Sequence, residues 1–193
     1  MNMIQILGIF ILGIFYLAYF GKMLGQRKKG IQTNQLGVGK KKKRTMYTEI
    51  ILRTITTLIV FVIIISIYLN TTLISNGIVR YLGILLIGIG TVVFIAAMIT
   101  MRDSWRAGIP QGEKLQIVTK GMYRVSRNPA FLGFDLTYIG ATIAFGNVVL
   151  LLFSMVAITM MHLQILEEER YMETTFGGEY LAYKNRVARY LLW

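Results

Sequence analysis

Long apolar stretches separated by short polar segments dominate this chain. Five of them stand out, at about Met3–Phe20, Ile50–Leu69, Ile78–Met101, Ala130–Phe145 and Asn147–Leu166. The first three are long enough to cross about 30 Å of hydrocarbon as helices. The last two are separated only by a Gly-Asn turn signal, which predicts a tight helical hairpin. The pattern therefore predicts an all-α, polytopic membrane protein with about five transmembrane helices.

Two ionisable residues interrupt the apolar hairpin. The fourth stretch is short and carries Asp135, and the fifth carries His162, the only histidine in the chain. Ionisable residues inside membrane helices usually face the protein interior and pair with one another or with backbone. We expect these two side chains to satisfy each other, or nearby backbone, across the hairpin.

The composition agrees with a membrane location and sets an orientation. Of the 193 residues 55% are hydrophobic and 16% are charged, with a net charge of +12. The basic residues gather in three regions: 21–53, 102–127 and the segment after Leu166, leaving only Arg80 on the opposite side. The positive-inside rule then places these regions in the cytosol and the N-terminus outside. This distribution explains the charge without nucleic acid, and it makes membrane lipid the expected partner.

The Lys40–Arg44 run lies within the first basic loop, residues 21–49. We interpret it as a topology signal in a mobile loop, although contact with anionic lipid stays an alternative. The chain has no cysteine and a single histidine, which excludes cysteine-based and multi-histidine metal sites.

The first polar motif, GMYRVSRNPAFLG, covers Gly121–Gly133. Pro129 is suited to the first position of a helix, and Asn128 before it is a strong N-cap. Unpaired N–H groups in that first turn, with the Arg127 guanidinium beside them, suit a carboxylate or phosphate. Gly133 would allow a ligand or another helix to approach closely. The competing interpretation is a capped helix with an arginine at the membrane interface.

The second motif, EEERYMETTFGGEYLAY, covers Glu167–Tyr183. Three adjacent carboxylates are unfavourable at a helix C-terminus, so we expect the helix to continue into the cytosol. Adjacent helical positions differ by about 100°, so at most two of the glutamates can face one site. Aromatic residues at three- and four-residue spacing through Tyr190 predict an amphipathic C-terminal helix that closes a site over both motifs.

Together these residues resemble the isoprenylcysteine carboxyl methyltransferase family, whose C-terminal half is shared with phospholipid methyltransferases. The resemblance covers about Arg102–Arg189 and includes the upstream SWRAGI segment, Ser104–Ile109. It divides the chain into three N-terminal spans, residues 1–101, and a methyltransferase-like core, residues 102–193. Many relatives have histidine at Asn128 and tyrosine at Phe131, and a late proline of the family is absent near Leu191.

The resemblance implies S-adenosylmethionine bound at the cytosolic face, between the last two spans and the tail. The cofactor-binding positions that it implies are Val118, Gly121, Tyr123, Arg127, Asn128, Pro129, Phe131, Gly133, Glu168 and Glu169. The catalytic candidates are Arg124, Arg127 and Glu168.

The acceptor that the resemblance implies is amphiphilic, with a prenylcysteine-type carboxylate. A carboxylate acceptor is already ionised and needs no base, and one of Arg106, Arg124 and Arg127 would orient it. An amine acceptor would instead need Glu168 or Glu169 as a proton sink. Three alternatives stay open: a lipid-amine methyltransferase, a reductase-like protein that binds NADPH, and a membrane protein without enzymatic activity.

Overall fold

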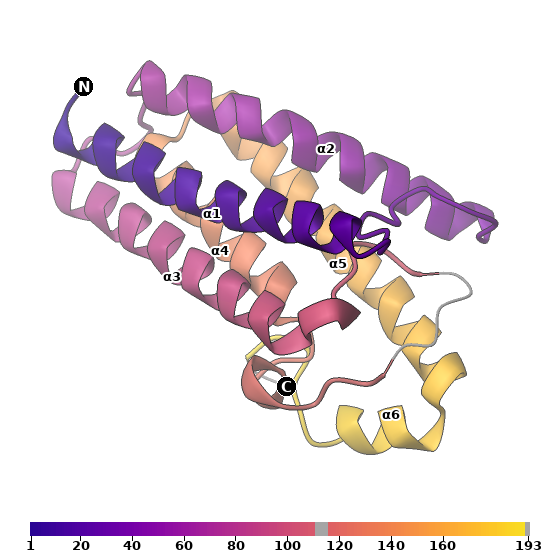
Figure 1. Cartoon of the computed structure of the whole chain (residues 1–193). Coiled ribbons are helices and arrows are strands. Elements are labelled where there is room, and N and C mark those ends of the chain that lie inside the picture. Colours follow the sequence, from indigo (N-terminus) through magenta and orange to yellow (C-terminus); the bar gives the residue numbers. More distant parts are fainter. Residues whose placement is uncertain (111–115, 192–193) are drawn as a thin grey trace.

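The computed structural model describes residues 1–110 and 116–191, so Lys114 of the second basic region lies outside the described part (Figure 1). The described helices are α1 (Met3–Lys28), α2 (Lys43–Tyr68), α3 (Gly77–Met101), α4 (Pro129–Phe145), α5 (Val148–Phe176) and α6 (Gly178–Lys184), with short 3-10 turns η1 (Arg102–Ser104) and η2 (Gly121–Arg124). Four of them, α1, α2, α3 and α5, are long and apolar enough to cross a membrane, and α4 is a shorter apolar helix. The prediction of an all-α polytopic membrane protein is confirmed.

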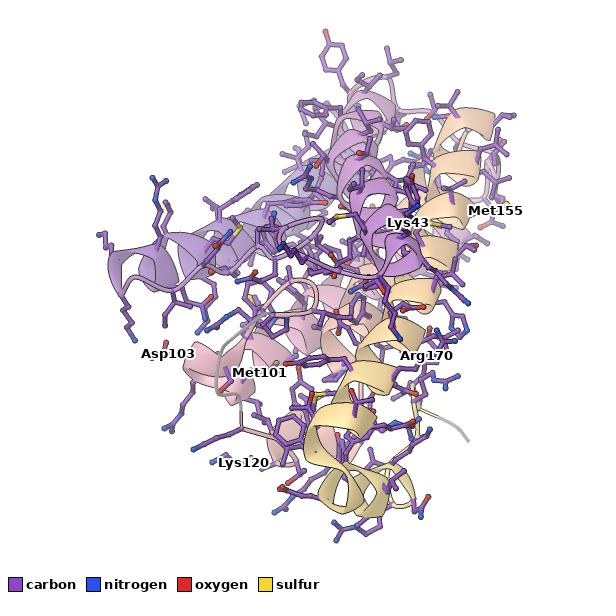
Figure 2. The ribbon with its side chains drawn as sticks, turned by 90° about the vertical axis from the view of Figure 1, so that its right-hand side faces the viewer. Lys43, Met101, Asp103, Lys120, Met155 and Arg170 are labelled. Carbon is purple, nitrogen blue, oxygen red and sulfur yellow. The ribbon has the colours of Figure 1, made fainter. Side chains whose placement is uncertain are left out.

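The long helices form a bundle, and most of the charged residues lie toward one of its ends. Figure 1 shows α1, α2 and α3 in front of α4 and α5, with the N-terminus at one end and α6 at the other. Figure 2 places Asp103, Lys120 and Arg170 toward the end that carries α6, and Met155 away from it. We call the α6 end the polar end.

Close contact between α3 and α4 depends on two pairs of glycines. A Cβ atom added at Gly83 would lie 2.7 Å from the Gly140 carbonyl oxygen, and one at Gly90 would lie 2.6 Å from the Gly133 oxygen. Small residues of this kind let membrane helices approach at backbone distance. Consequently α4 packs more extensively on α3 than on α5, its neighbour in sequence.

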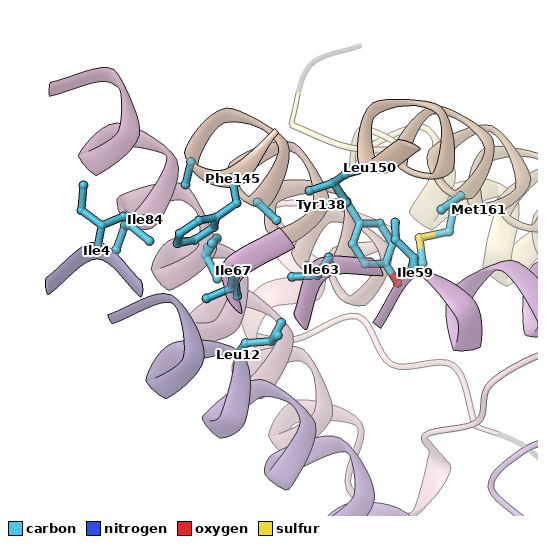
Figure 3. Packing of buried hydrophobic residues seen from close by; sticks show 14 of the residues in the cluster. Ile4, Leu12, Ile59, Ile63, Ile67, Ile84, Tyr138, Phe145, Leu150 and Met161 are labelled. Carbon is cyan, nitrogen blue, oxygen red and sulfur yellow. The ribbon is translucent and has the colours of Figure 1, made fainter. Parts of the chain in front are cut away.

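The core between α2, α4 and α5 is built from residues on one face of each helix. Ile59, Ile63 and Ile67 recur every fourth residue along α2 and are fully buried. Figure 3 shows them beside Tyr138 and Phe145 of α4, which are also fully buried. This packing fixes α4 and α5 relative to α2 and thereby positions the polar ends of both helices.

The predicted hairpin is present, with α4 and α5 joined by Gly146-Asn147. The Asn147 side chain caps α5 by accepting a hydrogen bond from the Leu150 N–H at 2.9 Å. Its amide also donates to the Ser66 hydroxyl at 2.8 Å, which ties the turn to α2. Seventeen residues of α4 span about 26 Å, and the first twenty-one of α5 about 31 Å. The start of α4 and the glutamates of α5 thus reach the same level at the polar end.

Arg80, which the sequence placed on the side of the membrane opposite to the other basic residues, stabilises the end of α4. Its side chain is buried and donates to the Ala144 carbonyl oxygen at 2.8 Å and to Asn70 Oδ1 at 2.6 Å. It also lies over the Phe145 ring. Arg80 therefore satisfies the C-terminal end of α4.

Two expectations about the polar segments need correction. The loop with the Lys40–Arg44 run is packed on the molecule: Gln35 donates through its N–H to the Ala107 oxygen at 2.8 Å. Within the run, Lys41 is an internal residue, 3% exposed at its side chain and paired with Glu49 at 2.6 Å. A buried carboxylate holds it there, which the positive-inside interpretation did not anticipate.

The predicted tail helix is also much shorter than expected. It ends at Lys184, so Val187 and Tyr190 lie in an irregular segment, residues 185–191, which we call the tail. Asp135 and His162 do not bond each other: His162 Nδ1 lies 2.9 Å from the Tyr190 hydroxyl, and Asp135 Oδ1 has no partner among the described residues. The returning tail supplies the histidine's partner, and the spacing of the hairpin did not reveal it.

Candidate functional site

The first motif folds as a 3-10 turn followed by the start of α4. The helix begins at Pro129, as predicted, with Asn128 in the N-cap position. The Asn128 side chain, however, makes no cap hydrogen bond; that part of the prediction is wrong. Its amide instead donates to Glu169 Oε1 at 3.3 Å and to the Arg189 carbonyl oxygen at 3.2 Å. The amide N–H groups are bonded to a buried carboxylate and a nearby carbonyl, and in this orientation the side-chain oxygen does not accept from the helix start.

Arg127 joins three parts of the polar end. Its side chain is 6% exposed and donates to Glu169 Oε1 from both Nε, at 3.2 Å, and Nη2, at 3.1 Å. Its Nη1 donates to the carbonyl oxygens of Lys184 and Val187, and its backbone N–H donates to the Ala188 oxygen at 2.9 Å. Arg127 thus holds the tail against α5.

The three glutamates of the second motif have different surroundings, as helical geometry requires. Glu167 faces α2, where it accepts from the Thr45 hydroxyl at 2.8 Å. It also pairs with Arg170 of its own helix, α5. Glu169 faces the tail and is bonded by Arg127, Asn128 and Arg189. Glu168 accepts from the Gln164 amide at 3.0 Å, and its other oxygen has no donor among the described residues.

These surroundings shift the acidity of the two inner glutamates, which lie beyond the apolar part of α5 that ends at Leu166. Burial raises the pKa of Glu168 to about 7; the neighbouring Glu49 charge adds to this, and the Gln164 hydrogen bond opposes it. Burial also acts to raise the pKa of Glu169, but the hydrogen bonds and charges of Arg189 and Arg127 outweigh it, so this pKa lies below its usual value. Glu169 is a fixed anion, and Glu168 titrates near neutrality.

A small aromatic cluster seats α6 on the rest of the site. Tyr180, Tyr183 and Val187 are buried together against Ile117, Met172 and Phe176. The Tyr183 hydroxyl donates to the Tyr123 carbonyl oxygen at 2.7 Å. Aromatic residues of the predicted amphipathic helix therefore cover the site from one side.

A cavity of about 140 Å³ lies between both motifs and α6, and we call it the cofactor cavity after the cofactor that the sequence resemblance implies. Seven of the predicted site residues line it: Val118, Tyr123, Arg127, Asn128, Phe131, Glu168 and Glu169. The remaining predicted residues, Gly121, Arg124, Pro129 and Gly133, are not among its lining.

The two predicted glycines have backbone roles. Gly121 adopts a φ of +58°, and a Cβ there would lie 2.6 Å from the Thr100 hydroxyl, so the turn before η2 needs glycine. Gly133 faces α3, where a Cβ would lie 2.7 Å from that of Phe94. The sequence predicted that Gly133 would allow either a ligand or a helix to approach closely, and the structure shows that the neighbour is helix α3.

A larger cavity of about 430 Å³, the apolar cavity, adjoins the first. It is lined mainly by apolar and aromatic side chains of α1, α2 and α4, and it reaches Phe61 of α2, which is 59% exposed. Arg106 is the one charged residue in its described lining. The two cavities share four residues: Trp105, Arg106, Ala130 and Phe131. A cavity with several charged side chains and a larger cavity with one charged side chain therefore meet at a shared wall.

Sequence reasoning placed SWRAGI in the resemblance but did not assign Trp105 to the site. The sequence signal that could have identified Trp105 is its position beside an arginine just after a membrane span, because both residue types are suited to a membrane interface. It also missed Gln164, Glu49 and Lys41, which lie behind Glu168. A glutamine inside an apolar helix is the one weak indication of that cluster.

Comparison of the sequence with known proteins identifies the family to which the chain belongs. The sequence pattern of the phospholipid methyltransferase family matches residues 78–179, just over half of the chain. The chain belongs to this family. The match covers nearly all of α3, the whole of α4 and α5, the first motif and the second motif as far as residue 179, and these parts supply most of the lining of the cofactor cavity.

Curated relatives carry a related name. The chain is 36% identical over 72 residues to the protein-S-isoprenylcysteine O-methyltransferase of Schizosaccharomyces pombe, covering 37% of this chain and 30% of that protein. It is 31% identical over 109 residues to protein-S-isoprenylcysteine O-methyltransferase A of Arabidopsis thaliana, and 29% over 108 residues to form B. The matched part spans 55% of each plant protein. The chain thus spans about half the length, or less, of these relatives.

Proposed function

We propose that this protein is a membrane methyltransferase that uses S-adenosylmethionine to methylate the carboxylate of an amphiphilic acceptor. The observation that carries the proposal is the shared wall between the cofactor cavity and the apolar cavity. A charged methyl donor and a lipid-like acceptor need adjoining compartments, one with several charged groups and one almost without them, and these residues supply both.

The cofactor cavity offers groups that suit S-adenosylmethionine. Glu168 presents a carboxylate oxygen without a donor among the described residues, which can accept hydrogen bonds from ribose hydroxyls or an ammonium. Tyr123, Tyr180 and Met172 supply aromatic and thioether surface for an adenine ring. The cofactor, when bound, supplies an electrophilic methyl group on a sulfonium.

The acceptor side favours a carboxylate over an amine. Arg106 is the only charged residue in the described lining of the apolar cavity. Its Nη1 donates to the Asp103 carbonyl oxygen at 2.6 Å and to the Trp105 oxygen at 2.9 Å, and the charge of its guanidinium would attract a carboxylate. Transfer forms a bond from carboxylate oxygen to methyl carbon and breaks the carbon–sulfur bond, so no proton moves. Trp105 and Phe131 at the shared wall would exclude water from the nucleophile. The names of the relatives support the same acceptor, a prenylated cysteine.

The family description also names phospholipids, which makes a lipid amine the second candidate. A protonated amine needs a base, and no carboxylate or histidine lines the described part of the apolar cavity. Family membership also supports methyl transfer over the reductase-like alternative. Under the positive-inside rule, the basic residues around the polar end support an active site that faces the cytosol.

The test is transfer of radioactive methyl from S-adenosylmethionine by the detergent-purified protein. The acceptors compared are an S-farnesylated cysteine derivative with a free carboxylate, the same compound as its carboxamide, and phosphatidylethanolamine vesicles. We expect label on the first alone, loss of transfer in Glu168→Ala and Arg106→Ala, and normal transfer in Arg27→Ala, which removes an exposed cation elsewhere. Labelling of phosphatidylethanolamine instead would identify an amine acceptor, and no transfer to any acceptor would refute the proposal.

A further inference from the structure

A buried polar cluster lies directly behind Glu168. Gln164 of α5, fully buried, donates through its amide to Glu168 Oε1 at 3.0 Å and reaches Glu49 Oε1 of α2 at 3.5 Å. Both neighbours are carboxylates, so only the NH₂ end of the amide can face them. The Gln164 carbonyl oxygen is buried without a partner among the described residues. The chain tolerates an unsatisfied oxygen so that one amide can bridge two carboxylates.

Glu49 is in turn fixed by the loop between α1 and α2. Its carboxylate is fully buried and accepts from the Lys41 ammonium at 2.6 Å, the Gly37 N–H at 2.8 Å and the Ile109 N–H at 3.0 Å. Lys41 also donates to the Gln35 carbonyl oxygen at 2.7 Å. Glu49 Oε2 accepts from Gly37 and Lys41 of the loop, and Oε1 accepts from Ile109 in another segment. Because both oxygens are bonded, Glu49 has little freedom to turn. The basic loop is therefore connected to Glu168 through two side chains.

We propose that Gln164 and the Glu49–Lys41 ion pair are positioning residues that hold the Glu168 carboxylate toward the cofactor cavity. This inference rests on the proposed function, because it assigns Glu168 to the cofactor. It goes further by making cofactor affinity depend on the packing of the loop that contains the Lys40–Arg44 run. The ion pair fixes Glu49, Glu49 accepts from the Gln164 amide, and that amide holds Glu168 Oε1 and thereby orients the other, free oxygen of Glu168.

The pH dependence of binding separates positioning from general stability. Glu168 is surrounded by Glu49 and Lys41 behind it, Tyr123 of η2, and Arg106, Arg127 and Glu169 around the cavity. The Gln164 hydrogen bond favours its ionised form, and its removal should raise the pH at which the carboxylate protonates. As the pH is lowered, binding that needs the ionised carboxylate is then lost at a higher pH than in the wild-type protein.

The experiment measures binding of S-adenosylhomocysteine, the demethylated product, by calorimetry between pH 6 and 8.5. The variants are Gln164→Met, Glu168→Gln and the double variant, with Gln5→Met as a matched control. Gln5 is also buried, but it bonds the Ile67 carbonyl oxygen at the opposite end of the bundle. We expect Gln164→Met to weaken binding about 5- to 20-fold at pH 7, by roughly 1–2 kcal/mol at 1.4 kcal/mol per tenfold, and to shift the pH midpoint upward. In the Glu168→Gln background the same change should have no further effect.

The outcomes separate the inference from the proposed function. Gln164→Met that binds as wild type, or that weakens binding equally with and without Glu168, would overturn the positioning role and leave the methyltransferase proposal intact. If Gln164→Met fails to fold, Lys41→Met provides the same comparison from the outer end of the cluster. Wild-type protein that binds no S-adenosylhomocysteine overturns the proposed function and this inference with it.

Discussion

Replacing Glu169 by alanine should release α6 and the tail from the site. Glu169 is the common acceptor for Arg127, Asn128 and Arg189. The Arg127 and Glu169 side chains are each 6% exposed, and removal of one partner from a buried pair costs about 3–5 kcal/mol. Arg189 is 33% exposed, so its pair adds only about 0–1 kcal/mol. Together these contributions are about 3–6 kcal/mol, so at about 1.4 kcal/mol per tenfold the docking equilibrium of the tail should fall by about two to four powers of ten.

Limited trypsin digestion measures this release, because Lys184 and Arg186 become cleavable when the tail undocks. When opening is fast, the cleavage rate follows the open population, so Glu169→Ala should be cut at least about 100-fold faster than wild type. The matched control is Glu173→Ala on the same helix, which removes a pair to Lys184 that is 34–35% exposed. That change should accelerate cleavage less than about fivefold. Equal cleavage of the two variants would refute the argument that burial makes the Glu169 contacts strong.

Three further predictions test other parts of the structure. Gly133→Ala should lower stability by about 1–3 kcal/mol in thermal unfolding because its Cβ meets α3, whereas Gly13→Ala, with nothing within 4 Å, should be neutral or stabilising; equal effects would contradict the glycine contact. Arg80→Met should cost about 1–3 kcal/mol by leaving the carbonyl end of α4 unsatisfied, and an unchanged unfolding temperature would show that this bond is dispensable. Thr57→Trp, in the lining of the apolar cavity, should raise the KM for a long-chain acceptor while S-adenosylhomocysteine binding stays normal; a parallel loss of both would place the two ligands in one space.

Apolar length and turn signals predict most of the fold. The five stretches, the hairpin at Gly146-Asn147 and the continuation of α5 beyond Glu167 follow from composition along the chain. The ends of α1 and α2 do not, because lysine and arginine are good helix formers and the helices continue into basic segments. The burial of Lys41 depends on Glu49 of α2, a contact made only when the loop packs.

The site shows the same division between local and long-range information. The two motifs predict that Arg127, Asn128, Glu168 and Glu169 meet, and they do. The motifs do not say which glutamate binds the tail and which faces the cavity, because that depends on side-chain direction at adjacent helical positions. Nor do they reveal Gln164, whose importance comes from two carboxylates on either side of it.

The contacts of Arg127 also set a time at which the site is completed during synthesis. Its donors go to the oxygens of Lys184, Val187 and Ala188, which lie about sixty residues later in the chain. At about 5–20 residues per second, the ribosome adds those residues roughly 3–12 seconds after Arg127. Helices α4 and α5 are synthesised in that interval, but α6, which supplies Tyr180 and Tyr183 to the lining of the cofactor cavity, is complete only near its end. A nascent chain therefore acquires its membrane anchor before it acquires a closed site.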